Sequence, residues 1–274
     1  MAEFFQILSR DYMRNAFIVG ITMAISLALL GVSLVLKKHS MIGDGLSHVG
    51  FGAVAVAVCF GFTPIYFAIP MVILASFLIL YLANKSKVFA DSAIAIFSTL
   101  ALAIGYAAIE LGEGINFNLG NYLYGSLLGV NLEDVILSIC VFIVVVLVFI
   151  LLYNRIFTVT FDETFSKSTG TKTTLMNIII SVLTSVTIVV GMKLMGALLI
   201  TSLIIFPVLS ARQIVKTFKK VTIFSVIFGA LSFTIGLLIC SIVMNLPIGS
   251  SIVFTSFILC MICLLIGKIM KKKC

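Results

Sequence analysis

Long apolar runs separated by short polar stretches make up most of this chain. A transmembrane helix needs about 20 mostly apolar residues, and candidate spans of this kind lie at 15–36, 45–61, 64–83, 91–110, 132–154, 174–191, 195–210, 222–244 and 251–268. Lipid offers no hydrogen-bond partners, so a spanning segment must satisfy its own backbone, and these runs are too long for barrel strands. The pattern predicts an all-α, polytopic transmembrane bundle of nine helices, or eight if 195–210 is a half-helix. We expect a single membrane domain over residues 1–274.

Composition and charge agree with a membrane chain. The sequence is 62% hydrophobic and 10% charged, whereas a soluble domain is about 25% charged. Of its 18 Lys and Arg, fifteen fall in alternate loops, at 37–38, 85–87, 155–172, 212–220 and 268–273. Because basic residues concentrate in cytoplasmic loops, we predict a cytoplasmic C-terminus and an external N-terminus. No basic stretch is interleaved with stacking aromatics, so nucleic-acid binding is not expected.

The turn between the first two spans holds both histidines of the chain. If the second helix begins near Gly43, Asp44 and His48 lie four residues apart, on one helical face. A carboxylate and an imidazole presented together suit zinc, manganese or ferrous iron, and titratable groups at membrane depth usually mark a pathway. The alternative is an ordinary interfacial turn, in which Asp44 caps the helix and His48 hydrogen-bonds to a neighbouring helix. The second histidine, His39, follows two lysines, and we expect it to be a solvated loop residue.

A second informative stretch follows the seventh span. Pro207 is expected to weaken the helix near the membrane exit. The segment after it, about 207–220, is basic and amphipathic, with Ile214 and Phe218 on one face. Two interpretations are equally consistent with its physics: an anchor on anionic lipids, or a coupling helix that docks into a separate motor protein. Its candidate coupling residues are Pro207, Arg212, Lys216 and Phe218.

Enzyme motifs are not found. The loop Ser-Thr-Gly-Thr-Lys-Thr-Thr at 168–174 lacks the upstream Gly and the Gly-Lys pair of a nucleotide-binding P-loop. The sequence has no H-E-x-x-H and no G-x-S-x-G, so neither an intramembrane metalloprotease nor a serine hydrolase is predicted. The Cys260-x-x-Cys263 pair lies inside an apolar run, where cysteine behaves as a small hydrophobe.

Four motifs in one order resemble the permease subunit of bacterial ATP-binding-cassette importers for zinc, manganese or iron. They are Lys-His-Ser-Met-Ile-Gly-Asp-Gly-Leu-Ser-His at 38–48, Leu-Tyr-Gly-Ser-Leu-Leu-Gly-Val at 123–130, Gly-Ala-Leu-Leu-Ile-Thr-Ser-Leu-Ile-Ile-Phe-Pro at 196–207 with Ala211 and Arg212, and Asn-Leu-Pro-Ile-Gly-Ser at 245–250. The chain differs from many relatives in having Ser126 where they often carry an acid.

This resemblance implies a fold related to that of cobalamin and siderophore importer permeases, in the bacterial cytoplasmic membrane. It implies a homodimer that binds ATPase subunits inside and receives the ion outside from an extracellular or periplasmic metal-binding protein. Asp44 and His48 would meet the transported ion, and the segment around 207–220 would couple to the ATPase. No permanently bound cofactor is expected, and the sequence does not choose between manganese, zinc and iron.

Two other classes of function are compatible with the same residues. A proton-coupled secondary metal transporter would act without an ATPase and use Asp44 and His48 as a proton relay. A receptor or scaffold would instead use the acidic outer loops as a docking surface and move no ion. ATP-dependent uptake distinguishes the three.

Overall fold

The computed structural model describes residues 11–85, 90–112, 125, 127–242 and 246–272 of the 274. These residues form α2 (Asp11–Leu36), α3 (Ile42–Cys59), α4 (Pro64–Lys85), α5 (Ala90–Leu111), η1 (Leu127–Gly129), α7 (Leu132–Leu151), α8 (Tyr153–Phe161), α9 (Glu163–Ser168), α10 (Thr173–Met195), α11 (Ala197–Ile214), α12 (Phe218–Ile242) and α13 (Ile248–Lys272). Nine of these helices are long and apolar enough to cross a membrane, within the described ranges. The expected all-α, nine-span architecture is confirmed.

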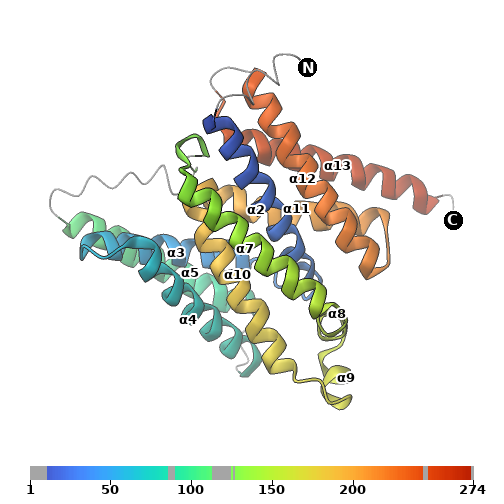
Figure 1. The fold of residues 1–274 in the computed structure, drawn as a ribbon. Helices are drawn as coiled ribbons and strands as arrows, with labels where there is room; N and C mark the ends of the chain where they lie inside the picture. Colours follow the sequence, from blue (N-terminus) through green and yellow to red (C-terminus); the bar gives the residue numbers. More distant parts are fainter. Residues whose placement is uncertain (1–10, 86–89, 113–124, 126, 243–245, 273–274) are drawn as a thin grey trace.

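Helix α2 lies at the centre of the bundle (Figure 1). It packs against α7, α10, α11 and α12, and 78% of its most apolar 18-residue window is buried, against 17% for α5. A helix that is apolar all round and buried belongs to a core, whereas one exposed on most faces borders lipid or another chain. Helices α3, α4 and α5 form one side of the molecule, and α11, α12 and α13 form the other (Figure 1).

Interhelical hydrogen bonds between small polar side chains hold this core together. Ser76 on α4 bonds Ser181 on α10 at 2.7 Å, and Ser33 on α2 bonds Thr160 on α8 at 3.0 Å. Small residues let helices approach closely, and their hydroxyls stabilise contacts that lipid would leave unsatisfied. The core is therefore fixed by short polar pairs as well as by apolar packing.

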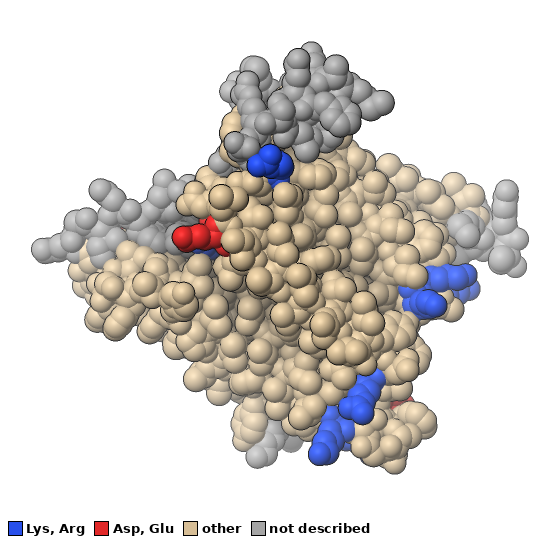
Figure 2. Space-filling view, in the orientation of Figure 1, with Lys and Arg blue, Asp and Glu red and all other residues tan. Residues whose placement is uncertain are grey.

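Each end of the bundle has a lysine that joins two segments. At the end predicted to be external, Lys193 of α10 donates to Asp134 of α7 at 2.7 Å. At the opposite end, Lys37 after α2 donates to Asn177 of α10. Each of these two hydrogen bonds therefore joins segments that are expected on the same membrane face. In Figure 2 Lys and Arg side chains lie at the right and lower right of the visible face and another lies at its top, an acidic side chain lies at the upper left, and the centre of that face carries none.

Two local predictions differ from the structure. Pro207 was expected to weaken the seventh span, but α11 continues through it to Ile214. Membrane helices tolerate such a proline where neighbouring helices pack against it, and Pro207 is buried 3.7 Å from where a Cβ on Gly229 of α12 would lie. The loop at 155–172 was expected to be long and polar, but it contains α9 and most of α8.

Candidate metal-transit site

Asp44 stands in the first turn of α3. The helix begins after Met41, which makes no side-chain capping bond. The carboxylate of Asp44 lies near the positive end of the helix dipole, where a negative charge is stabilised. Asp44 is therefore not the N-cap, and that part of the interfacial-turn interpretation is wrong.

Asp44 and His48 do lie on one face of α3, as their spacing predicts. His48 Nε2 is 3.7 Å from Asp44 Oδ2, and the two side chains are 25% and 42% exposed, respectively. This separation is longer than a hydrogen bond, so neither group satisfies the other. His48 Nδ1 is enclosed and has no hydrogen-bond partner among the described residues. The pair has unused coordination capacity on its open side.

Two glycines show which neighbours flank this pair. A Cβ at Gly45 would lie 2.3 Å from Ile94 of α5, whereas one at Gly43 would lie 2.7 Å from Ile204 of α11. Successive helical residues are rotated by about 100°, so Asp44 points between these two packing faces. The absence of side chains at both glycines lets α5 and α11 each approach α3 closely, and Asp44 projects from α3 between these two contacts.

The described residues of one chain supply only this pair of ligands. They contain no group of three or more His, Cys, Asp or Glu side chains that could hold a metal ion. A structural zinc site needs four ligands, and an Mg²⁺ or Ca²⁺ site more oxygens. One oxygen and one nitrogen ligand per chain can hold a dication only briefly, or with help from another molecule.

The four predicted coupling residues fall into two groups. Arg212, near the end of α11, and Lys216, in the short connection to α12, are exposed. Pro207 and Phe218 are buried. Phe218 opens α12 instead of sharing a helix with Ile214, as the sequence had led us to expect.

The burial of Phe218 joins two loops. Its ring packs against three aromatic rings of α8, with centroid distances of 5.5 Å to Tyr153, 5.2 Å to Phe157 and 5.9 Å to Phe161. Aromatic pairs at these distances contribute beyond their buried area. The connection between α11 and α12 is therefore fixed to α8, and the exposed Arg212 and Lys216 lie on the same surface region.

Comparison with known proteins identifies the family. A model of the ABC 3 transport family matches residues 9–267. The chain belongs to the ABC 3 transport family. Its resemblance to metal-importer permeases is thereby confirmed.

Curated relatives cover nearly the whole chain. The zinc uptake membrane protein ZnuB of Haemophilus influenzae is 29% identical over 88% of this chain and 92% of its own. The manganese import permease ScaB of Streptococcus gordonii is 28% identical over 89% and 87%. Among solved structures, PsaBC from Streptococcus pneumoniae in complex with Fab matches with a TM-score of 0.84 and 28% identity, covering 96% of this chain and 94% of that one. The sequence relatives and the structural match therefore agree with the family assignment.

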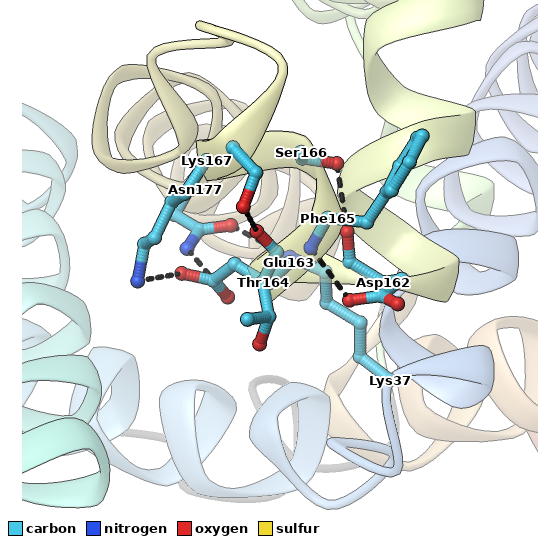
Figure 3. A network of polar contacts seen from close by, with 9 residues as sticks. Lys37, Asp162, Glu163, Thr164, Phe165, Ser166, Lys167 and Asn177 are labelled. Atoms are coloured by element: carbon cyan, nitrogen blue, oxygen red, sulfur yellow. Dashed lines mark hydrogen bonds and ion pairs between the residues drawn. The ribbon is translucent and has the colours of Figure 1, made fainter.

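Two features of this ABC 3 family chain were not predicted from its sequence. Helix α9, with Lys37 and Asn177, forms a polar network at the end of the bundle predicted to be cytoplasmic (Figure 3). His39, expected to be solvated, is half-buried with its Nδ1 enclosed and unpartnered among the described residues. Burial lowers the pKa of His39, and the charge of Lys37 lowers it further, against the opposing effect of Asp91 and Glu163. The signal available in the sequence was Asn177, a polar residue near the start of an apolar span.

Proposed function

We propose that this chain is the permease subunit of an ATP-driven importer, and that Asp44 and His48 receive a divalent metal ion on its way inward. The observation that carries this proposal is the open, unsatisfied carboxylate–imidazole pair at 3.7 Å on α3, in a chain of a transport family. A relative whose name assigns it to zinc uptake and another assigned to manganese import support the substrate class. Manganese, zinc and iron all accept such ligands.

An incomplete ligand set suits passage better than storage. A transport site must bind the ion well enough to remove part of its hydration shell and weakly enough to release it. Two ligands per chain with exposed side chains meet that requirement, because water can occupy the remaining positions. A second copy of the chain, related by a two-fold axis along the pathway, would bring two carboxylates and two imidazoles together. The homodimer is thus part of the proposal.

The energy source is proposed to lie on another chain. This sequence has no P-loop, so ATP hydrolysis would take place on ATP-binding-cassette subunits at the cytoplasmic face. ATP binding there would shift an equilibrium between outward-open and inward-open states. The exposed Arg212 and Lys216 are proposed to contact the ATPase, and the buried Pro207 and Phe218 to position them. An extracellular metal-binding protein would deliver the ion to the opposite face, with the C-terminus cytoplasmic.

The experiment is metal uptake into proteoliposomes, with and without the partner ATPase. We expect radioactive manganese or zinc to accumulate only when both ATPase and ATP are present. Asp44→Ala and His48→Ala should each reduce uptake by roughly a hundredfold, since even outer-shell partners of metal ligands contribute ~10–100-fold. Asp91→Asn, which changes an exposed carboxylate at the start of α5, serves as the matched control and should retain uptake.

Two outcomes would contradict the proposal. Uptake driven by a proton gradient without ATPase would favour the secondary transporter. Full uptake by both the Asp44 and the His48 variants would remove the site assignment.

A further inference from the structure

The α2–α3 turn is tied to α9 by a half-buried polar bridge. Lys37 Nζ donates to Asn177 Oδ1 at 2.6 Å, and Asn177 Nδ2 donates to Glu163 Oε2 at 3.4 Å. The asparagine therefore uses both ends of its amide to join a cation on one element to a carboxylate on another (Figure 3). Hydrogen bonds to charged groups are the stronger kind in proteins. The bridge joins the α2–α3 turn to the consecutive helices α9 and α10, which lie more than 120 residues further along the chain.

The α9 side of the bridge belongs to the surface that faces the cytoplasm in the predicted topology. Helix α9 is short and held by its own bonds: Asp162 caps Phe165 N at 2.9 Å, and Lys167 pairs with Glu163 at 3.2 Å. Its neighbour α8 packs on Phe218. A force applied to this surface by a bound ATPase would reach Glu163 directly.

On the α2 side of the bridge, a short, hydrogen-bonded turn connects Lys37 to the transit site on α3. Lys37 N and His39 N donate to carbonyls of α2, and Ile42 N donates to His39 O at 3.1 Å, so the turn is bonded to both helices. Lys38 has a φ of +64°, a left-handed conformation that keeps the turn short. Helix α3 starts at Ile42, and Asp44 lies in its first turn. A shift of Lys37 therefore moves the start of α3.

A small cavity beside the bridge leaves some room for that movement. Its volume is about 50 Å³, and it is lined by Lys37, His39, Leu46, Glu163 and Asn177 among others. Leu46 belongs to α3, and the lining includes the unpartnered His39. Packed interiors resist deformation, so a cavity between α9, the turn and α3 marks the place where these elements can move relative to one another.

We infer that Lys37, Asn177 and Glu163 are positioning residues that transmit the movement of the cytoplasmic α8–α9 surface to Asp44 and His48. The bridge converts the nucleotide state of the partner ATPase into a displacement of the first turn of α3. This inference rests on the proposed transit function of that pair. The bridge does not touch the ion; it acts by placing the ligands.

A charge exchange across Asn177 tests this role. Lys37→Glu and Glu163→Lys each place like charges at the two ends of the amide, and each should reduce the metal ions moved per ATP hydrolysed by about tenfold, the size of a typical allosteric coupling. In the double variant the charges are exchanged, and a rotation of the Asn177 amide by half a turn restores both hydrogen bonds. We expect its ratio to return to within about threefold of wild type, since coupled sites are not additive.

Lys167→Gln is the matched control. It removes the other partner of Glu163 but leaves the bridge to Lys37 intact, so the ratio should not change. Should a charge variant fail to insert in the membrane, Asn177→Leu removes both hydrogen bonds at similar size and should uncouple in the same way. All variants are measured with the complete permease and ATPase complex in proteoliposomes, with ATP hydrolysis recorded in parallel.

The inference and the proposed function fail differently. If the wild type moves no manganese or zinc, the proposed function fails and this inference fails with it. If the wild type transports but the single variants and Asn177→Leu keep its ratio of ions to ATP, only the inference is overturned. Loss in the single variants without recovery in the double variant also overturns it, because a general structural defect explains that result.

Discussion

Two pairs of a carboxylate with a basic side chain, at different places in the bundle, show the difference between a structural and an open arrangement. Lys193 and Asp134 join α10 to α7 at 2.7 Å, and Asp134 is only 12% exposed. Asp134 also accepts from Asn131 N in the capping box of α7. Asp44 and His48 lie on one helix, 3.7 Å apart, and the Asp44 carboxylate is 42% exposed, although His48 at 25% is less exposed than Lys193 at 39%. The first pair is closed by its own partners, whereas the second leaves ligand atoms available.

The difference indicates that a membrane protein can use a charged pair either to stabilise its fold or to leave a site open for an ion. A charged group within a bundle is costly unless it is paired. The Lys193–Asp134 pair meets that cost by mutual contact and a cap. The pair on α3 meets it only in part, through exposure and the helix dipole, which is the arrangement expected of a group that pairs with a passing ion.

The largest effect should come from removing charge at the open pair. Asp44→Asn keeps the size of the side chain, so we expect the unfolding free energy to stay within about 0.5 kcal/mol. Uptake should fall by roughly a hundredfold, since a lost ligand costs at least as much as a lost outer-shell partner. Thermal unfolding and radioactive metal uptake on the same preparations test this. If the loss of uptake is accompanied by a large loss of unfolding free energy, the pair is structural.

The closed pair should give the opposite result. Lys193→Met leaves the Asp134 carboxylate largely buried without its partner, which should cost about 1–3 kcal/mol of unfolding free energy. Lys167→Met, at the exposed pair with Glu163, should cost less than about 1 kcal/mol. Denaturant titration of the two variants beside the wild type makes the comparison. A smaller loss for Lys193→Met than for Lys167→Met would contradict the assignment.

A packing variant can disturb the open pair without touching it. A Cβ at Gly52 would lie 2.3 Å from the backbone oxygen of Ala101 on α5, whereas one at Gly50 would lie 3.2 Å from the flexible end of Met192. Gly52→Ala should therefore separate α3 from α5, lower the unfolding free energy by ~1–3 kcal/mol and reduce uptake. Gly50→Ala is the control, and it should keep both the unfolding free energy and the uptake of the wild type. Identical behaviour of the two variants would argue against a close α3–α5 contact as a support of the site.

The smallest expected effect is the pH dependence of stability at the polar network around Glu163. Burial acts to raise the pKa of Glu163, but hydrogen bonds from Lys167 and Asn177 and the charges of Lys37 and Lys167 lower it more, so the net pKa is depressed. Glu163 therefore contributes stability above its ordinary pKa, and this contribution is lost as the pH falls through the depressed value. The difference in melting temperature between wild type and Glu163→Gln should be present at neutral pH and vanish in acid. Glu133→Gln, at an exposed carboxylate of α7, should show no such trend. A melting-temperature difference between wild type and Glu163→Gln that grows in acid would contradict the predicted direction.

Much of the fold follows from hydropathy. The nine apolar runs correspond to nine long helices in the described ranges, because lipid leaves a spanning segment few alternatives to a helix. The spacing of Asp44 and His48 also predicted their common face. The sequence also predicts a short interfacial helix at 121–128, and most of it lies outside the described residues, which there are Gly125 and the short η1 (Leu127–Gly129).

The remaining features depend on contacts between segments. Pro207 stays inside α11 because of its packing, which proline propensity alone does not report. Phe218 was predicted to share one face of an amphipathic segment with Ile214, but it opens α12 and α8 covers it. Helices α8 and α9 were missed because short amphipathic helices in a polar loop have no long apolar run. The bridge through Asn177 joins Lys37 to a helix 140 residues further along the chain, and no local pattern could place them together.

Electron–nuclear spectroscopy of Mn²⁺ bound to the permease tests the central claim most directly. The chain contains two histidines, so a hyperfine coupling between the manganese and an imidazole nitrogen has only His39 and His48 as sources within it. The account predicts this coupling in wild type and in His39→Gln, and its loss in His48→Gln and Asp44→Ala. Persistence of the coupling in His48→Gln, or its absence from the wild type with Mn²⁺ bound, would contradict the account.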